Sequence, residues 1–106
     1  MTALTEQDFR VKSHEALEQA RRALMPLADQ EGFEIEMQEG TLNLLFEDPS
    51  EARFVVSPNA PVRQIWVAAM ARGYKLAWAP ELGAFALDGE PLPNLLERLA
   101  RTHLQL

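Results

Sequence analysis

Residues 32–46, GFEIEMQEGTLNLLF, decide the fold class of this chain. After Gly32, apolar residues alternate with polar ones, as on a strand that buries one face and exposes the other. The apolar positions are Phe33, Ile35 and Met37, and the polar positions are Glu34, Glu36 and Gln38. Residues 38–40, QEG, indicate a turn, and Leu42, Leu44 and Phe46 continue the alternation on a second strand. This segment therefore predicts a β-hairpin with one carboxylate-bearing face.

An amphipathic helix is expected before the hairpin, over Glu6–Gln30. Its apolar residues recur at helical spacing and form one stripe: Phe9, Ala16, Leu17, Ala20, Leu24 and Ala28. Thr5 followed by Asp8 resembles a capping box, and Gly32 suits the left-handed conformation that ends many helices. Pro26 removes one hydrogen bond and crowds the preceding turn, so we expect the helix to kink there or to re-form.

Short strands and a second helix follow the hairpin. The expected strands are Arg53–Val56, Gln64–Met70, Tyr74–Ala79 and Phe85–Leu87, and the expected helix runs from Leu92 to about His103. Ser57 to Pro61 is expected to end the first of these strands, and Pro93 suits the first turn of the helix. The order of a helix, several strands and a helix predicts one α+β domain over residues 1–106. We expect two helices on one face of a twisted, mainly antiparallel sheet of about five to six strands.

The composition limits the possible functions. The chain has 106 residues, a net charge of −6 and no cysteine, which excludes disulfides and thiolate chemistry. Residues 1–51 carry 12 acidic and 4 basic side chains, whereas residues 52–106 carry 4 acidic and 6 basic ones. An acidic surface opposes nucleic acid and anionic lipid and favours cations or a basic partner, although it also simply keeps a protein soluble. From the acidic surface we expect a protein that binds neither nucleic acid nor membrane. Met1–Phe9 does not have the pattern of a signal peptide, so we expect the protein to be cytoplasmic.

One local sequence resembles a known family. Residues 57–68, SPNAPVRQIWVA, are similar to the signature strand of the frataxin family, including its bacterial CyaY-type members, in which a polar turn with a proline precedes Gln-(Ile/Val)-Trp-Leu. Residues 40–44, GTLNL, and the Gly73-Tyr74 pair resemble two further family segments. Residues 88–90, DGE, followed by residues 95–97, LLE, resemble the turn into the closing helix of the family.

The resemblance implies a non-enzymatic accessory or regulatory protein of iron–sulfur cluster assembly. Its implied partners are a cysteine desulfurase and an iron–sulfur scaffold protein, and it is expected to be a monomer. The implied partner-binding residues are Asn59, Gln64 and Trp66, on a sheet face that the family exposes. From the residues alone, a tryptophan on a strand is more often part of the core. An exposed indole with polar neighbours would suit a protein interface, whereas Trp78 is expected to pack against the sheet.

The resemblance also implies weak surface binding of Fe²⁺ and Fe³⁺ by an acidic ridge on the first helix and first strand. The candidate ligands are Glu15, Glu18, Asp29, Glu31, Glu34 and Glu36. Clustered carboxylates suit iron as a hard cation. Arg21 and Arg22 lie where relatives usually place carboxylates, which implies weakened iron binding. For Glu15 and Glu18, an ordinary solvated helix face remains an alternative.

A second function is compatible with the same architecture. Type III secretion chaperones are also small acidic α+β proteins, and such a module would have no metal role. The QIW sequence at residues 64–66 favours the frataxin interpretation. His14 and His103 match no recognised metal spacing, and we identify no catalytic residues.

Overall fold

The computed structural model describes residues 4–106 of the chain. Met1 to Ala3 lie outside the described residues. They are the start of the segment in which we expect no signal peptide. The elements are α1 (Glu6–Glu31), β1 (Glu34–Gln38), β2 (Thr41–Phe46), β3 (Ala52–Asn59), the 3₁₀ turn η1 (Ala60–Val62), β4 (Gln64–Ala69), β5 (Arg72–Ala79), β6 (Ala84–Leu87), β7 (Glu90–Pro91) and α2 (Leu92–Leu104).

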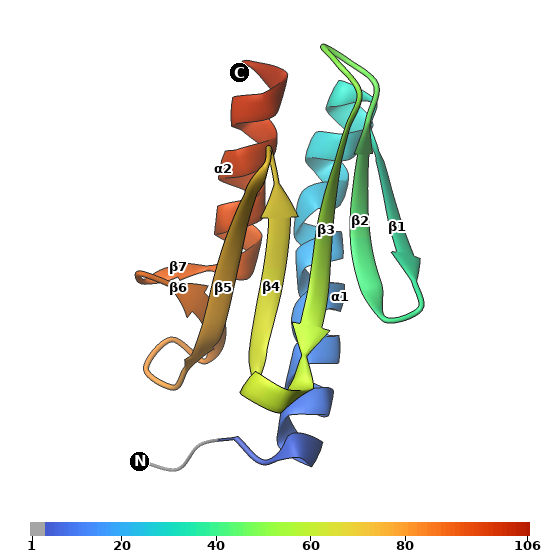
Figure 1. Ribbon diagram of the computed structural model, residues 1–106. Coiled ribbons are helices and arrows are strands. Elements are labelled where there is room, and N and C mark those ends of the chain that lie inside the picture. The colour runs from blue at the N-terminus through green and yellow to red at the C-terminus, as the bar shows by residue number, and fades with distance from the viewer. Residues whose placement is uncertain (1–3) are drawn as a thin grey trace.

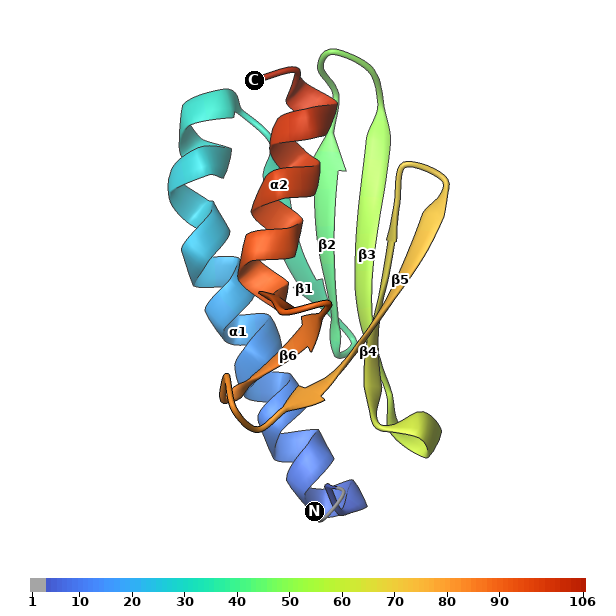
Figure 2. The same ribbon diagram turned by 90° about the vertical axis from the view of Figure 1, so that its left-hand side faces the viewer.

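The elements form two layers. Strands β1 to β7 make one sheet in which each strand pairs antiparallel with the next along the chain. Both helices cover the same face of this sheet, so that the strands lie in front of the helices in Figure 1 and beside them in Figure 2. The predicted α+β class and the arrangement of its layers are therefore confirmed. We call the sheet face that points away from the helices the outer face.

Helix α1 begins and ends where its capping residues predict. The Thr5 side chain accepts a hydrogen bond from the backbone N–H of Asp8 at 3.0 Å. Gly32 has a φ of 84°, and its N–H donates to the carbonyl of Ala28 at 2.7 Å. The helix includes Pro26 as one continuous element, so of the two expected alternatives, a kink or a break, the break does not occur. Pro26 is exposed, and water can therefore take the hydrogen bond that the helix loses.

Strand β1 of the β1–β2 hairpin has the predicted alternation, whereas on β2 Asn43 is buried together with the predicted Leu42, Leu44 and Phe46. Along β1, exposed Glu34, Glu36 and Gln38 alternate with half-buried Ile35 and Met37, which pack against the core. The two-residue turn at Glu39 and Gly40 has positive φ angles of 52° and 79°, as a hairpin of this kind requires. The glutamates of β1 consequently lie on the outer face.

Strand β3 is longer than the sequence indicated. It continues to Asn59, and Pro58 pairs with Ile65 of β4, so the predicted end of the strand at Val56 is wrong, although the strand does end within residues 57–61. Along an antiparallel strand, successive residues direct their backbone N and C=O groups to opposite neighbouring strands. The Pro58 nitrogen therefore points to the β2 side of β3. The β2–β3 ladder ends at the Leu42–Val56 pair, so the missing N–H costs no ladder bond.

The number of strands and the boundaries around the β4–β5 turn also differ from the prediction. The sheet has seven strands instead of five or six. The additional strand β7, Glu90–Pro91, could not be predicted because two residues are too few to show an alternating pattern. Met70 belongs to the β4–β5 turn, where it and Ala71 both have positive φ. Strand β5 therefore begins at Arg72, two residues before its predicted start.

The core lies between the helices and the sheet. Helix α2 contributes buried leucines at helical spacing, namely Leu92, Leu95, Leu96 and Leu99. At one end of the core, the rings of Phe33 and Phe54 both pack against Phe46, with centroid distances of 4.6 and 4.8 Å. The His103 ring of α2 lies 4.8 Å from that of Phe46, and its Nε2 atom lies 3.2 Å from the Ser50 carbonyl oxygen. This histidine thus joins the end of α2 to the β2–β3 loop.

Candidate functional site

Trp66 lies at the centre of the outer face. Along β4, buried Ile65 and Val67 point to the core, whereas Trp66 between them is 37% exposed. Trp66 pairs with Ser57 of β3 on one side and with Lys75 of β5 on the other. The placement agrees with the family resemblance and not with the core position that a strand tryptophan more often has.

Two polar contacts hold the indole in place. Its Nε1–H donates to Oε1 of Gln64 at 2.9 Å, and the Lys75 ammonium lies 5.0 Å from the ring centroid. Such a cation–π contact orients both groups at a surface. Asn59 pairs with Gln64 across β3 and β4, so the three expected partner-binding residues lie on adjacent positions of two strands. This part of the site is brought together as the sequence indicated.

An apolar depression of about 200 Å³ lies beside Trp66. It is lined by Val55, Ser57, Trp66, Val67, Ala68, Gly73, Tyr74 and Lys75. Val55, Ala68 and Gly73 are neighbours across the three strands, and their side chains become smaller in that order until glycine has none. The hollow lies where these side chains are small or absent. Sequence reasoning missed the residues of β3 and β5, because only the pairing register shows that they surround Trp66.

The candidate metal ligands separate into two groups. Glu34 and Glu36 are both exposed on the outer face of β1, at an edge of the sheet. Three strand spacings, about 14 Å, separate them from the strand that carries Trp66. Asp29 and Glu31 lie in the last turn of α1, where Glu31 Oε2 accepts a hydrogen bond from Gln30 Nε2 at 3.0 Å.

Glu18 on α1 already has cationic partners. Its Oε1 atom lies 3.0 Å from Nη2 of Arg21 and 3.9 Å from Nε of Arg22. The hydrogen bond from Arg21 lowers the pKa of the Glu18 carboxyl below its ordinary value, with smaller contributions from the charges of Arg21, Arg22 and His14. A metal ion would have to compete with these arginines for Glu18. Neighbouring Glu15 is exposed and forms none of the ion pairs found within residues 4–106.

We predict that Arg21→Gln raises the pKa of Glu18 toward its ordinary value. Because the folded-state pKa is lowered, the contribution of this pair to stability is present above the ordinary carboxyl range. It is lost as the pH falls through the lowered pKa. A ¹³C-detected NMR titration of the glutamate carboxyls measures the midpoint directly. Arg10→Gln, which removes the partner of Glu6 instead, is the control, and an unchanged Glu18 midpoint in Arg21→Gln would contradict the assignment.

The carboxylates do not form a closed metal site. Within residues 4–106, no three His, Cys, Asp or Glu side chains converge in a way that could hold a metal ion. The donors are chemically suited to iron, but the arrangement fits only an open association at the surface.

Within residues 4–106, neither helix combines the length and the apolar character needed to cross a membrane.

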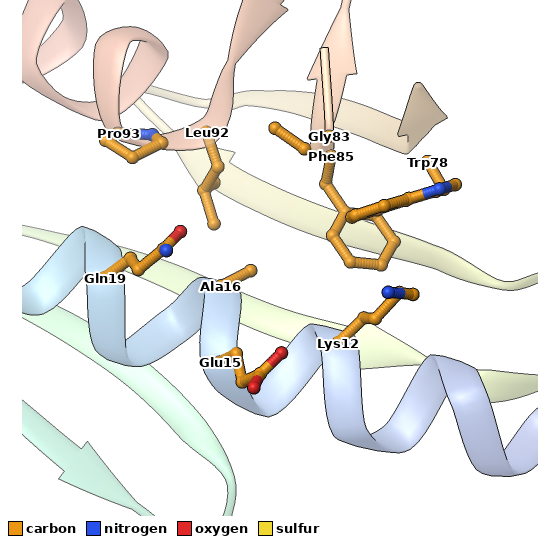
Figure 3. Close-up of a pocket in the computed structure, with 10 residues that line it drawn as sticks. Lys12, Glu15, Ala16, Gln19, Trp78, Gly83, Phe85, Leu92 and Pro93 are labelled. Atoms are coloured by element: carbon orange, nitrogen blue, oxygen red, sulfur yellow. The ribbon is translucent and has the colours of Figure 1, made fainter. Parts of the chain in front are cut away.

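Trp78 is on the opposite face of the sheet from Trp66. Its ring packs edge-on against Phe85 at 5.2 Å, and the Lys12 ammonium of α1 lies 4.7 Å from its centroid. Figure 3 shows these side chains around a pocket between α1, β6 and the start of α2. Its volume of about 80 Å³ is well below the roughly 300 Å³ of typical small-molecule sites. Trp78 therefore packs on the core, as the sequence predicted.

Fold and surface together define a class of protein: a two-layer α+β domain that presents an open antiparallel sheet with an exposed tryptophan. A frataxin structure from Psychromonas ingrahamii aligns with a TM-score of 0.69 at 14% identity, covering 96% of this chain and 93% of that one. At this identity the similarity concerns the fold alone.

Sequence comparison gives the family. Residues 2–105 match the family model of the frataxin-like domain. The iron–sulfur cluster assembly protein CyaY of Pseudomonas fluorescens is 30% identical over 101 residues, covering 92% of this chain and 86% of that protein. The protein of the same name from Pseudomonas aeruginosa is 37% identical over 68 residues, covering 62% and 61%. The chain belongs to the CyaY-type frataxin family.

Proposed function

We propose that this protein is a cytoplasmic, monomeric accessory protein of iron–sulfur cluster assembly. It binds the complex of a cysteine desulfurase and an iron–sulfur scaffold protein and modulates that complex without catalysing a reaction itself. The names of its relatives, which are iron–sulfur cluster assembly proteins, support this role. Family membership favours it over a secretion chaperone, which was the alternative from the sequence.

The exposed indole of Trp66 carries the proposal of a partner surface. Most large apolar side chains of the chain are buried, yet Trp66 is held outward beside an apolar depression by Gln64 and Lys75. Tryptophan in such a setting is typical of the few residues that supply most of the binding energy of an interface. Mixing the protein with the reconstituted desulfurase–scaffold complex and measuring the binding isotherm tests the proposal. No binding at protein concentrations up to about 100 µM, a weak affinity on the usual scale, would refute it.

Iron association is the second part of the proposal. Glu34 and Glu36 are the most suitable ligands because both are exposed on one face of β1 and neither has an ion-pair partner within residues 4–106. Asp29 and Glu31 follow. Glu15 and Glu18 are the weakest candidates because Arg21 and Arg22 pair with Glu18 and repel a cation, and Glu15 lies only three residues before it on the same helix.

We predict that the double substitution Glu34→Gln and Glu36→Gln weakens Fe²⁺ binding by about tenfold, because two carboxylate ligands are lost. An anaerobic ¹⁵N NMR titration with Fe²⁺ would measure the loss of broadening along β1. Ca²⁺ serves as a control for charge alone. The matched variant Glu47→Gln with Glu51→Gln removes the same charge from the exposed residues around the β2–β3 loop and should leave Fe²⁺ binding nearly unchanged. Equal binding by both double variants would remove Glu34 and Glu36 from the account.

A further inference from the structure

Five of the eight residues of strand β5 form a free sheet edge. The strand pairs with β4 from Arg72 to Ala77, but β6 pairs with it only at Ala77, Trp78 and Ala79. Residues 72–76 therefore have a strand on one side only, and in Figure 1 no strand lies beside this part of β5 on the side away from β4. We call the backbone of residues 72–76 on this side the β5 edge.

The β5 edge presents unpaired backbone groups. The two-residue turn at Met70 and Ala71 makes Ala69 and Arg72 a hydrogen-bonded pair, and such pairs alternate along the ladder. The N–H and C=O groups of Arg72, Tyr74 and Leu76 consequently point to β4. Those of Gly73 and Lys75 point outward, and the described residues supply no other strand to receive them. Both residues are exposed, so water solvates these groups in the free protein.

The side chains along the β5 edge indicate what could pair with it. Gly73 borders the apolar depression, and a Cβ atom placed on it meets no other atom within 4 Å. A neighbouring strand could place an apolar side chain over this hollow. Lys75, two residues further on the same face, holds its ammonium over Trp66 and forms none of the ion pairs found within residues 4–106.

The charge of the β5 edge selects an acidic partner. Arg72 and Lys75 are both exposed and without an acidic partner among residues 4–106, in a protein whose overall charge is −6. Lysine on an edge strand discourages pairing with another basic strand. A carboxylate opposite Lys75 would instead be attracted.

We infer that the β5 edge binds an extended peptide segment of a partner protein by antiparallel strand addition. The segment carries an acidic residue opposite Lys75 and, two residues later, an apolar residue opposite Gly73. Backbone hydrogen bonds to Gly73 and Lys75 would supply affinity, and the two side chains would supply specificity. The inference goes beyond the proposed function because it specifies a binding mode for any partner with such a segment. Its test uses no iron–sulfur assembly protein, so the two proposals can fail separately.

The test uses the full chain and a capped peptide, acetyl-Thr-Glu-Thr-Leu-Thr-amide. At a peptide concentration of twice its Kd, amide hydrogen exchange at Gly73 and Lys75 is expected to slow about threefold. Exchange at Tyr74 and Leu76, which already pair with β4, should not change. Gly73→Pro removes one outward N–H and should raise the Kd about fivefold relative to Gly73→Ala, which keeps that N–H and narrows the hollow in the same way.

Charge reversal provides the rescue. Lys75→Glu should weaken the glutamate peptide about tenfold and bind the corresponding lysine peptide about as well as the wild-type protein binds the glutamate peptide. Shifts around Trp66 without protection of Gly73 and Lys75, or no binding at about 5 mM peptide, a limit beyond ordinary weak affinities, would overturn the inference. Concentration-dependent protection of the same amides without peptide would assign the β5 edge to the acidic β1 strand of a second copy, and would overturn it as well.

Discussion

Trp66→Ala is expected to weaken binding of the desulfurase–scaffold complex by about thirtyfold or more. Truncating a central tryptophan of an interface typically costs at least about 2 kcal/mol, which corresponds to such a factor. The indole is partly exposed in the free protein and forms its hydrogen bond only with neighbouring Gln64. The substitution should therefore leave the fold largely intact. Titration calorimetry of the variant against the reconstituted complex measures the loss.

Controls separate this effect from a general change of surface. Leu82→Ala removes an apolar side chain that is 46% exposed and lies in the β5–β6 turn, outside the depression. This variant should bind the complex within about twofold of the wild-type affinity. Lys75→Ala, which removes the cation over the ring, should have an intermediate effect. If Trp66→Ala bound the complex as tightly as Leu82→Ala does, the outer face would not be the partner surface.

Phe54→Ala is expected to lower the free energy of unfolding by about 3–5 kcal/mol. The side chain is fully buried in β3, and its ring packs 4.8 Å from Phe46 and 6.1 Å from His103. Removing it leaves a cavity between the sheet and the end of α2. Since domains of this kind are stable by roughly 5–15 kcal/mol, the variant should unfold at a much lower urea concentration.

The control for this prediction is Val11→Ala, at a side chain of α1 that is 53% exposed. It should change the free energy of unfolding by less than about 0.5 kcal/mol. A loss of less than about 1 kcal/mol for Phe54→Ala would show that the aromatic cluster at this end of the core is not tightly packed.

The fold could be predicted largely because its signals are local. Thr5, through its side-chain hydroxyl, and Gly32, through its backbone N–H, set the limits of α1 with hydrogen bonds to residues three or four positions away. The alternation along β1 directly reports which face is buried. The same holds for the leucines of α2, which recur at helical spacing. These features depend on neighbours in the sequence and need no knowledge of the tertiary structure.

The errors arose where pairing decides the structure. Pro58 has the signal of a strand breaker, yet its nitrogen points to a place where β2 has not begun, so the strand continues. The β4–β5 turn lacks the glycine or asparagine that such turns usually have. Met70 and Ala71 adopt the positive φ angles in their place. A turn without its usual residues could be located only from the register of the two strands.

The candidate site was predictable in its residues more than in its shape. The apolar run around Trp66 is compatible with either face of a strand, and the family resemblance, not periodicity, indicated that the indole is exposed. The depression beside it depends on three strands, and the free β5 edge depends on the length of β6. Arg21 was expected to oppose iron binding, and the structure adds that it pairs with Glu18 directly.

The role of the outer face as the partner surface is tested most simply with the two tryptophans of the chain, which serve as internal references for each other. The outer face carries Trp66, and the core side of the sheet carries Trp78, so their indole N–H signals report on opposite faces. In a ¹⁵N NMR titration with the reconstituted desulfurase–scaffold complex, the account predicts early broadening of the Trp66 indole signal together with the side-chain amides of Gln64 and Asn59. The Trp78 indole should broaden only with the molecule as a whole. Selective loss of the Trp78 signal, or equal loss of both at every ratio, would contradict the account.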